Sequence, residues 1–348
     1  MTEQRQNARK TFALKRGEIR NLGPIAGTGS GTGRIGIGAV DLGEMVVLAD
    51  GMAVAIGGDG WTGDWLGPLD HPSHYPSVGM IASPESLGAW GPVRVAGLFG
   101  AGDGSRNELF AQPSPSRGNT LPAGTVQLDG TTYVMVAGTT ALKPTGGTWL
   151  VEAKSGQPGW TEVPGSLRPG DYADGGQSQI SGYQGKDGNV YVAADAFDRT
   201  HGITLYRAEP GTFPDRSTWQ PYGRRSDGTL GWGAAKVTPI TGRDVKFGEI
   251  SMREIGGKTV LSGFNVNSGS VEVRVADDPT KLFTQGHLTT IATQQDVPQN
   301  YGGYIVPGST LDHMRILVSQ WHVPTDRRGR PKGPGTYNVQ ELAANVNR

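Results

Sequence analysis

Two aspartates are spaced so that their carboxylates could act as a pair. Asp41 lies in the sequence AVDLGEM and Asp59 in AIGGDGW, eighteen residues further along. That interval fits a strand, a turn through Ala49-Asp50-Gly51 and a returning strand, so both acids would reach the same edge of a hairpin. Such pairs serve glycoside hydrolysis, in which one acid protonates the leaving oxygen and the other acts as base or nucleophile. The alternative is a purely local role, because Asp beside Gly is also a common turn residue.

Aromatic residues gather near the predicted turns and strand ends: they are Trp61, Trp65, Tyr75, Trp90, Trp232, Tyr301, Tyr304 and Trp321. Sugar-binding sites present aromatic faces in this way, but rings packed between sheets would leave the same pattern, so both interpretations stay open. His71 and His74 form an H-x-x-H pair in a Pro-rich loop, which predicts a surface or site-rim position rather than a metal site.

The elements that would hold these residues are short strands. The 348 residues include 56 Gly and 23 Pro, interspersed with Val/Ile/Tyr-rich runs. Hairpins with glycine-bearing turns recur, as in LDGTTYVMV, KDGNVYVAA and IGGKTVLSG. About five units of four strands predict an all-β fold, a five-bladed β-propeller, with a pair of β-sandwiches as the alternative. We expect residues 1–25 to form a polar N-terminal tail, residues 26–348 to form one propeller domain, and the strand near Val339 to pair with an N-terminal strand.

Composition excludes several classes of function. The chain has no cysteine, which rules out disulfides, zinc-thiolate sites and thiol nucleophiles. Its formal net charge is zero, so it lacks the basic footprint of a nucleic-acid-binding protein. No apolar run is long enough to span a bilayer, and the first twenty residues contain no apolar core of a secretory signal.

Several motifs together resemble the endo-D-arabinanases of glycoside hydrolase family 183, found in actinobacteria and in the tail proteins of their phages. The likeness covers residues 36 to 342, and its motifs are VDLG at 40–43, GDG at 58–60, GEISMR at 248–253, YGGYIVPGS at 301–309 and VSQW at 318–321. The second motif departs from the family, because GGDGW stands where an aromatic-Gly-Asp-Thr pattern is expected.

The resemblance implies a five-bladed propeller that cleaves internal α-D-arabinofuranosyl bonds of arabinogalactan or lipoarabinomannan. It also implies that Asp41 and Asp59 are the acid/base pair. The substrate-binding residues that we expect around them are Glu249, Arg253, Trp61, Trp232, Tyr301, Tyr304, Gln320 and Trp321. Glu249 and Arg253 are four residues apart and would share a strand face, with Arg253 as the ion partner of Glu249 or as a second sugar contact. A structural ion pair between blades is the alternative.

Further expectations concern mechanism, cofactors and partners. An open funnel gives water access opposite the leaving group, so we expect hydrolysis with inversion. No cofactor is expected, although the funnel leaves room for a structural cation. The expected partners are the cell-wall arabinan and other phage tail or envelope proteins, with no nucleic acid and no membrane span. The protein would act on the cell envelope from a phage virion or by leaderless export. A non-catalytic wall-binding module of a phage tail is the alternative function.

Overall fold

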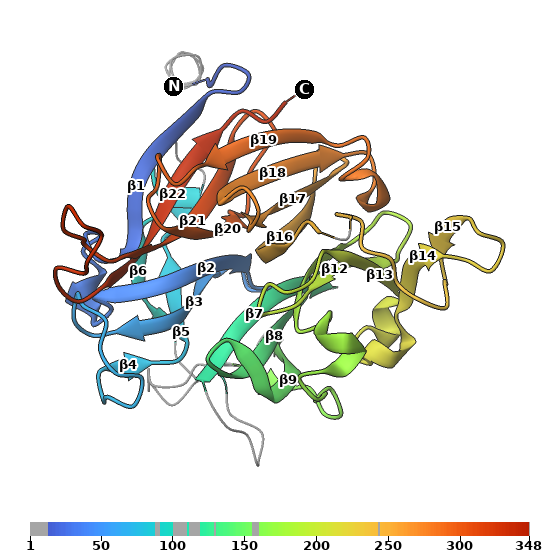
Figure 1. Ribbon diagram of the computed structural model, residues 1–348, viewed down its shortest axis with the longest axis horizontal. Coiled ribbons are helices and arrows are strands. Elements are labelled where there is room, and N and C mark those ends of the chain that lie inside the picture. The colour runs from blue at the N-terminus through green and yellow to red at the C-terminus, as the bar shows by residue number, and fades with distance from the viewer. Residues whose placement is uncertain are drawn as a thin grey trace.

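The computed structural model describes residues 13–87, 91–99, 110, 119–128, 130–154, 160–242 and 244–347. Within them the fold is all-β, as predicted, with strands grouped around a common centre (Figure 1). The helical elements of the described residues are single turns: η1 (Thr32–Ile35), α2 (Pro84–Leu87), η2 (Tyr172–Gly175), η3 (Pro210–Thr212), η4 (Arg216–Thr218) and η5 (Pro279–Lys281).

Three of the sheets are antiparallel and compact. One has the order β2 (Ala39–Val47), β3 (Ala53–Trp61), β5 (Val78–Ala82) and β6 (Val95–Phe99), with β4 (His74–Tyr75) also paired to β3. The next comprises β16 (Phe247–Ile255), β17 (Lys258–Asn265), β18 (Ser270–Ala276) and β19 (His287–Ala292). The last has the order β1 (Ile19–Gly27), β22 (Thr336–Ala344), β21 (Met314–His322) and β20 (Asn300–Ile305).

A fourth, nine-stranded sheet joins two antiparallel groups through one short parallel contact. The first group comprises β10 (Thr161–Glu162), β9 (Lys143–Lys154), β8 (Thr131–Thr140) and β7 (Asn119–Leu128). The second comprises β11 (Gln179–Gln184), β12 (Val190–Asp195), β13 (Thr204–Ala208), β14 (Gln220–Arg224) and β15 (Leu230–Trp232). Only Val126 and Gln127 of β7 pair with Gly182 and Tyr183 of β11, so the two groups meet at their innermost strands.

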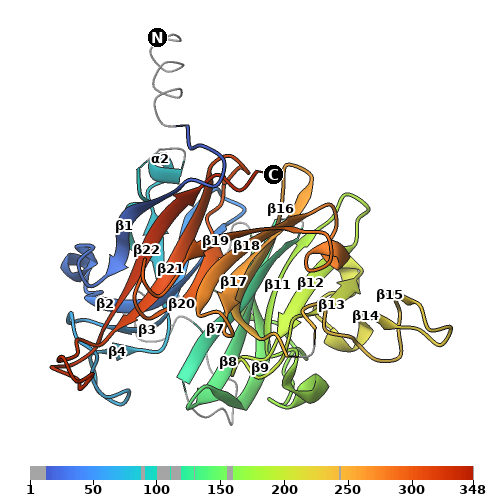
Figure 2. The ribbon, with the colours of Figure 1, turned by 45° about the horizontal axis from the view of Figure 1, so that its top comes forward.

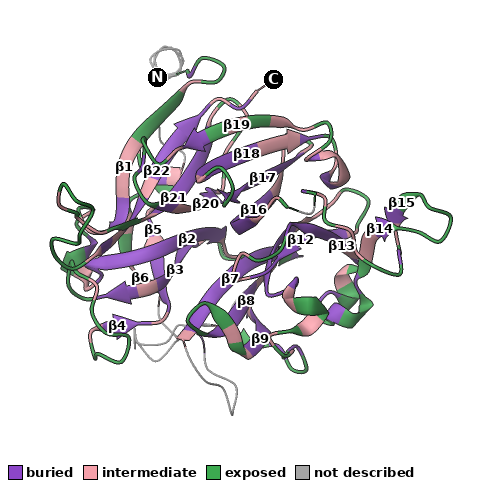
Figure 3. Cartoon of the chain, in the orientation of Figure 1, coloured by how far each residue is buried: buried purple, intermediate pink, exposed green. Residues whose placement is uncertain are grey.

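The innermost strands surround the centre of the molecule. β2 contacts β7 and β20, β11 contacts β7 and β16, and β16 contacts β20. These strands are buried almost throughout, as Figure 3 shows for β2, β7 and β16. Hydrophobic clusters fill the spaces between neighbouring sheets. For example, Val54 and Ile56 of β3 pack with Val134 and Val136 of β8, and Met45 of β2 belongs to a cluster with strands of the last sheet.

The N-terminal strand completes the sheet that contains the C-terminal strand. β1 runs antiparallel to β22 in both views (Figures 1 and 2), and Ala26 pairs with Val339. The predicted pairing near Val339 is therefore confirmed. Residues 19–25, predicted to lie in a polar tail, belong to β1, while residues 1–12 of that tail lie outside the described residues. Hydrogen bonding to β22 explains the difference, because it orders a segment that the sequence alone presents as polar.

A buried polar network ties the innermost strands together and corrects the prediction for Arg253. The Arg253 guanidinium on β16 binds Glu44 on β2, and it donates to Thr125 Oγ1 at 2.8 Å and Ser181 Oγ at 2.9 Å. Glu249 is therefore not its ion partner. The physical reason is a β-bulge between Gly248 and Ser251, which breaks the alternation on which the shared face depended. The side chain of Glu44 is 2% exposed, so Arg253 forms a buried ion pair between two sheets, but with Glu44 and not with Glu249.

Candidate functional site

The candidate site lies where the innermost strands begin. Asp41 is the third residue of β2, Asn119 the first of β7 and Gln179 the first of β11, while Glu249 is the third of β16 and Tyr301 the second of β20. Tyr301 donates a hydrogen bond to Asp41, and the Gln179 side chain accepts one from the backbone N–H of Glu249, so these strand starts meet at one face of the molecule.

Asp41 is turned towards its partner by an irregular stretch of β2. The register with β3 shifts on both sides of Leu42, which has a positive φ of 57°. Gly58 on β3 leaves the necessary space, since a Cβ there would lie 2.5 Å from Asp41 Oδ1. The predicted hairpin geometry is confirmed, because β2 and β3 are adjacent antiparallel arms joined through residues 48–52.

The Asp41 carboxyl is buried and only partly hydrogen bonded. Oδ2 accepts a hydrogen bond of 2.8 Å from the Tyr301 hydroxyl, whereas Oδ1 has no partner among the described residues. Burial raises the pKa of Asp41 well above its usual range, and the nearby charges of Asp59 and Glu249 raise it further against the opposing effect of Tyr301. Asp41 is therefore suited to hold a proton.

Asp59 occupies a different environment a short way along β3. Its Oδ1 lies 2.7 Å from His74 Nε2 and 2.6 Å from Asn119 Nδ2. A carboxylate can only accept, so the Nε2-protonated form of His74 fits this contact, and two N–H donors then stabilise the ionised acid. The Asp59 side chain is 16% exposed, and among the described residues both hydrogen-bond donors bind Oδ1 and none binds Oδ2.

His74 and Asn119 were not predicted as members of the site. The sequence predicts a surface or site-rim position for His74, but the residue is buried, because β4 pairs with β3 at Trp61 and brings the imidazole back beside Asp59. The imidazole also lies against the Trp61 ring, with centroids 4.8 Å apart. Asn119 carries no comparable signal, since its position depends on the contact between separate sheets.

Glu249 is a third carboxylate of the site, on the side of the molecule next to the loop after β12. Its carboxylate binds the Arg199 guanidinium, with Arg199 Nε at 3.1 Å from Oε1, and the Arg199 guanidinium lies 5.5 Å from the Tyr301 ring centroid. Burial raises the pKa of Glu249, and the charge of Arg199 opposes that rise. Asp195, at the end of β12, is fully buried with no hydrogen-bond partner for either oxygen among the described residues. Burial raises the pKa of Asp195 well above its usual range, and the charge of Glu249 adds to the effect.

Three of the predicted aromatic residues, Trp61, Tyr301 and Tyr304, lie near these carboxylates. The Tyr337 ring contacts both Trp61 and Tyr301, at centroid distances of 5.9 and 6.3 Å. Tyr304 is buried, and the charges of Glu249, Glu44 and Asp41 add to burial in raising its pKa.

The remaining predicted site residues lie further out. Trp321 pairs with Tyr337 across β21 and β22 and is 49% exposed. Gln320 binds Pro298 O and Asn338. Trp232 lies apart from the carboxylates, on the outermost strand of the nine-stranded sheet, where it packs against Tyr191 and Tyr222. Trp90 lies outside the described residues.

The described residues show neither a metal-binding cluster nor a spanning helix. Nowhere among them do three His, Asp or Glu side chains converge so that they could hold a metal ion. In the same part of the chain, no helix is long and apolar enough to cross a membrane.

Known structures share the fold at low sequence identity. A Bacteroides ovatus protein superposes with a TM-score of 0.59 at 12% identity, over 88% of this chain and 86% of that one. The Podospora anserina α-L-arabinofuranosidase, in complex with cellotriose, superposes with a TM-score of 0.51 at 11% identity, over 95% of this chain and 97% of that one. A Xanthomonas citri GH43_1 enzyme complexed with xylose superposes with a TM-score of 0.52 at 11% identity, over 92% of this chain and 90% of that one. Glycosidases of the last two kinds are β-propellers, so the likeness shows a propeller-type fold.

Sequence comparison places the chain in a family. An uncharacterized 35.9 kDa protein of Mycolicibacterium smegmatis is 36% identical over 346 residues, which cover 93% of this chain and 97% of the relative. The family model described as domain of unknown function DUF4185 matches residues 26–342, and the chain belongs to this family.

Proposed function

We propose that the protein is an endo-acting glycoside hydrolase that cleaves internal α-D-arabinofuranosyl linkages of mycobacterial-type arabinogalactan or lipoarabinomannan at the cell envelope. One observation carries the proposal: Asp41 and Asp59 meet on two arms of a hairpin in unlike surroundings, because burial raises the pKa of Asp41 while Asp59 accepts hydrogen bonds from His74 and Asn119. Two interacting carboxylates in unlike surroundings are the arrangement that acid/base glycosidases use.

The two acids then have separate roles. Asp41, buried and proton-holding, donates its proton to the glycosidic oxygen as the bond to the anomeric carbon breaks. Asp59, positioned by its hydrogen bonds from His74 and Asn119, takes a proton from the water that attacks the anomeric carbon. The mechanism inverts the anomeric centre. NMR of the first-formed product tests this step, since an α product from an α bond would mean retention.

The polysaccharide is proposed from likeness and from the aromatic surroundings. The motifs around Asp41, Asp59 and Glu249 resemble those of endo-D-arabinanases, and the propeller-type fold is shared with an arabinofuranosidase. The Mycolicibacterium origin of the relative fits a wall arabinan as substrate. Tyr337 beside the acids and the exposed Trp321 supply aromatic faces that suit sugar rings, whereas Trp61 is buried and packs behind them against His74 and Tyr337.

We also propose that the sheets form five blades. The short β7–β11 contact marks the boundary between two blades of the nine-stranded sheet, and hydrophobic clusters fill the spaces between successive groups of strands. The pairing of β1 with β22 would close the ring.

The decisive experiment is incubation with purified mycobacterial arabinogalactan, followed by sizing of the soluble products. We expect release of oligosaccharides, and a loss of about 10²–10⁴-fold in turnover for Asp41→Asn and for Asp59→Asn with unchanged circular dichroism. Binding to the polysaccharide without any product would instead indicate a wall-binding module. Near-normal turnover by Asp59→Asn would show that Asp59 has no chemical role.

A further inference from the structure

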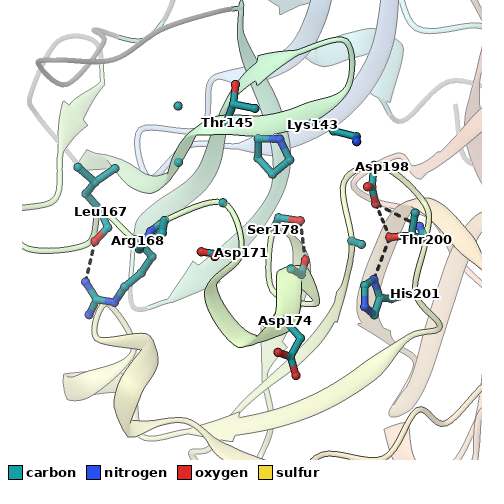
Figure 4. Close-up of a pocket in the computed structure, with 17 residues that line it drawn as sticks. Lys143, Thr145, Leu167, Arg168, Asp171, Asp174, Ser178, Asp198, Thr200 and His201 are labelled. Atoms are coloured by element: carbon teal, nitrogen blue, oxygen red, sulfur yellow. Dashed lines mark hydrogen bonds between the residues drawn. The ribbon is translucent and has the colours of Figure 1, made fainter.

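A separate cavity lies on the same face as the carboxylates. It has a volume of about 840 Å³, within the range of about 300–1,000 Å³ usual for ligand sites. Its walls come from the start of β9, the segment around η2 before β11, and the segment after β12 (Figure 4). Figure 4 shows Asp171 between the Leu167–Arg168 side and the Asp198–His201 side.

Two connections join this cavity to the candidate site. Asp198 and Thr200 line the cavity, while Arg199 between them binds Glu249. On the other side, Asn119 binds Asp59, and its cross-strand partner is Thr139, close along the chain to the cavity residue Lys143. A ligand in the cavity would therefore contact chain segments next to Arg199 and Asn119, the residues that bind Glu249 and Asp59.

The polar groups of the cavity present mainly hydrogen-bond acceptors. Asp171 and Asp174 are exposed, and in the described part of the chain their carboxylates form no hydrogen bond or ion pair. The Arg168 guanidinium is already committed, because it binds Asp215 and the backbone carbonyls of residues 165 and 167. Of the remaining wall, Leu167 is 42% exposed and lies near two prolines.

This chemistry selects a neutral, polyhydroxylated ligand. The cavity is lined by three carboxylates, of Asp171, Asp174 and Asp198, against Lys143, His201 and one arginine that is already paired, which disfavours anions. The described residues form no cluster able to hold a metal ion. Carboxylates accept hydrogen bonds from hydroxyl groups, and the apolar wall suits the C–H face of a sugar.

We propose that the cavity binds sugar units of the polysaccharide that are several residues away from the bond being cleaved. The inference rests on the proposed function, and it makes the cavity a determinant of chain-length preference. Longer substrates reach the cavity and gain hydrogen bonds to Asp171 and Asp174, whereas the shortest substrates occupy only the region of Asp41 and Asp59.

The test compares arabinan oligosaccharides of graded length, prepared by partial hydrolysis of arabinogalactan. The variant is the double substitution Asp171→Asn with Asp174→Asn. Asp174 has a positive φ of 57°, and Asn tolerates that conformation, so the backbone should be kept. The matched control is Asp50→Asn, in the turn at the far end of the β2–β3 hairpin, where the side chain's one hydrogen bond among the described residues comes from the backbone N–H of Met52.

We expect kcat/KM of the double variant to fall about tenfold for long oligosaccharides and to stay unchanged for the shortest one cleaved. Calorimetric binding of the same oligosaccharides to an Asp59→Asn background should show the same length-dependent loss. This second readout separates the two proposals, since it needs no turnover. Equal kcat/KM and equal binding at every length, with and without the double substitution, would overturn the cavity assignment even if the wild-type protein degrades arabinogalactan.

Discussion

Replacing Tyr301 by Phe removes the hydrogen bond that the buried Asp41 carboxylate receives. The Tyr301 hydroxyl lies 2.8 Å from Asp41 Oδ2 and lowers the pKa of that carboxyl, while Oδ1 has no partner among the described residues. A hydrogen bond to a charged group contributes about 1.5–3 kcal/mol, and about 1.4 kcal/mol corresponds to a tenfold change in proton affinity. Tyr301→Phe should therefore strengthen proton binding by Asp41 at least about tenfold.

The sign of the effect on activity follows from the role of Asp41. If Asp41 must be protonated to donate to the leaving oxygen, its raised pKa sets the alkaline limb of the pH profile, and a further rise extends activity to higher pH. We expect the alkaline limb of kcat/KM for Tyr301→Phe to move up by about one pH unit, with the acid limb unchanged. The assay measures reducing ends released from arabinogalactan between about pH 4 and pH 9.

Tyr304→Phe serves as the matched control. Tyr304 is also buried beside these carboxylates, but it forms no hydrogen bond with Asp41 in the described part of the chain, so its removal should leave both limbs in place. An upward movement of the acid limb in Tyr301→Phe would show that Asp41 is the base. A profile identical to that of the wild type would refute the link between Asp41 and the pH dependence.

Three further predictions concern buried groups. Gly58→Ala places a Cβ 2.5 Å from Asp41 Oδ1 and should lower turnover about 100-fold, whereas Gly63→Ala, which meets nothing within 4 Å, should leave it unchanged. Asp195→Asn should be more stable than the wild type by about 1–3 kcal/mol near pH 7. The reason is that the raised pKa of Asp195 makes the wild type lose stability as pH rises above about 4. A difference in urea midpoint between the two proteins that is the same at pH 4 and at pH 7 would contradict this. Glu341 on β22 forms a buried ion pair with Arg315 on β21, and Glu341→Gln should cost about 3–5 kcal/mol in urea unfolding, because the buried guanidinium would lose its only counter-charge among the described residues and keep neutral carbonyl partners.

The sequence predicts the strands and the aspartate pair because both depend on local patterns. The glycine turns end one strand and start the next, and Gly130, Gly188 and Gly257 indeed have positive φ in the turns of three predicted hairpins. The pairing of Asp41 with Asp59 needs only that one hairpin forms in register. Such features depend on contacts within about twenty residues of the chain, so they can be predicted from a single sequence.

The partners of these groups depend on longer-range contacts. The face shared by Glu249 and Arg253 was expected from regular alternation, but the β-bulge at Gly248–Ser251 separates them. Glu249 then binds Arg199, which lies in the loop between β12 and β13. A bulge is one inserted residue, and nothing in GEISMR marks it.

The different roles of the two acids also arise from longer-range contacts. Asp41 and Asp59 sit in equivalent places on two arms of one hairpin, so their own strands do not decide which one holds the proton. The decision comes from what neighbouring strands bring to them, with β4 from the same sheet and β7 and β20 from other sheets. β7 and β4 bring Asn119 and His74, whose N–H donors stabilise Asp59 as an anion, whereas β20 brings a single hydroxyl to a buried Asp41. An unlike pair of carboxylates is therefore a property of how the sheets assemble, and substitutions at Asn119 or Tyr301 should change the acid/base balance without altering either aspartate.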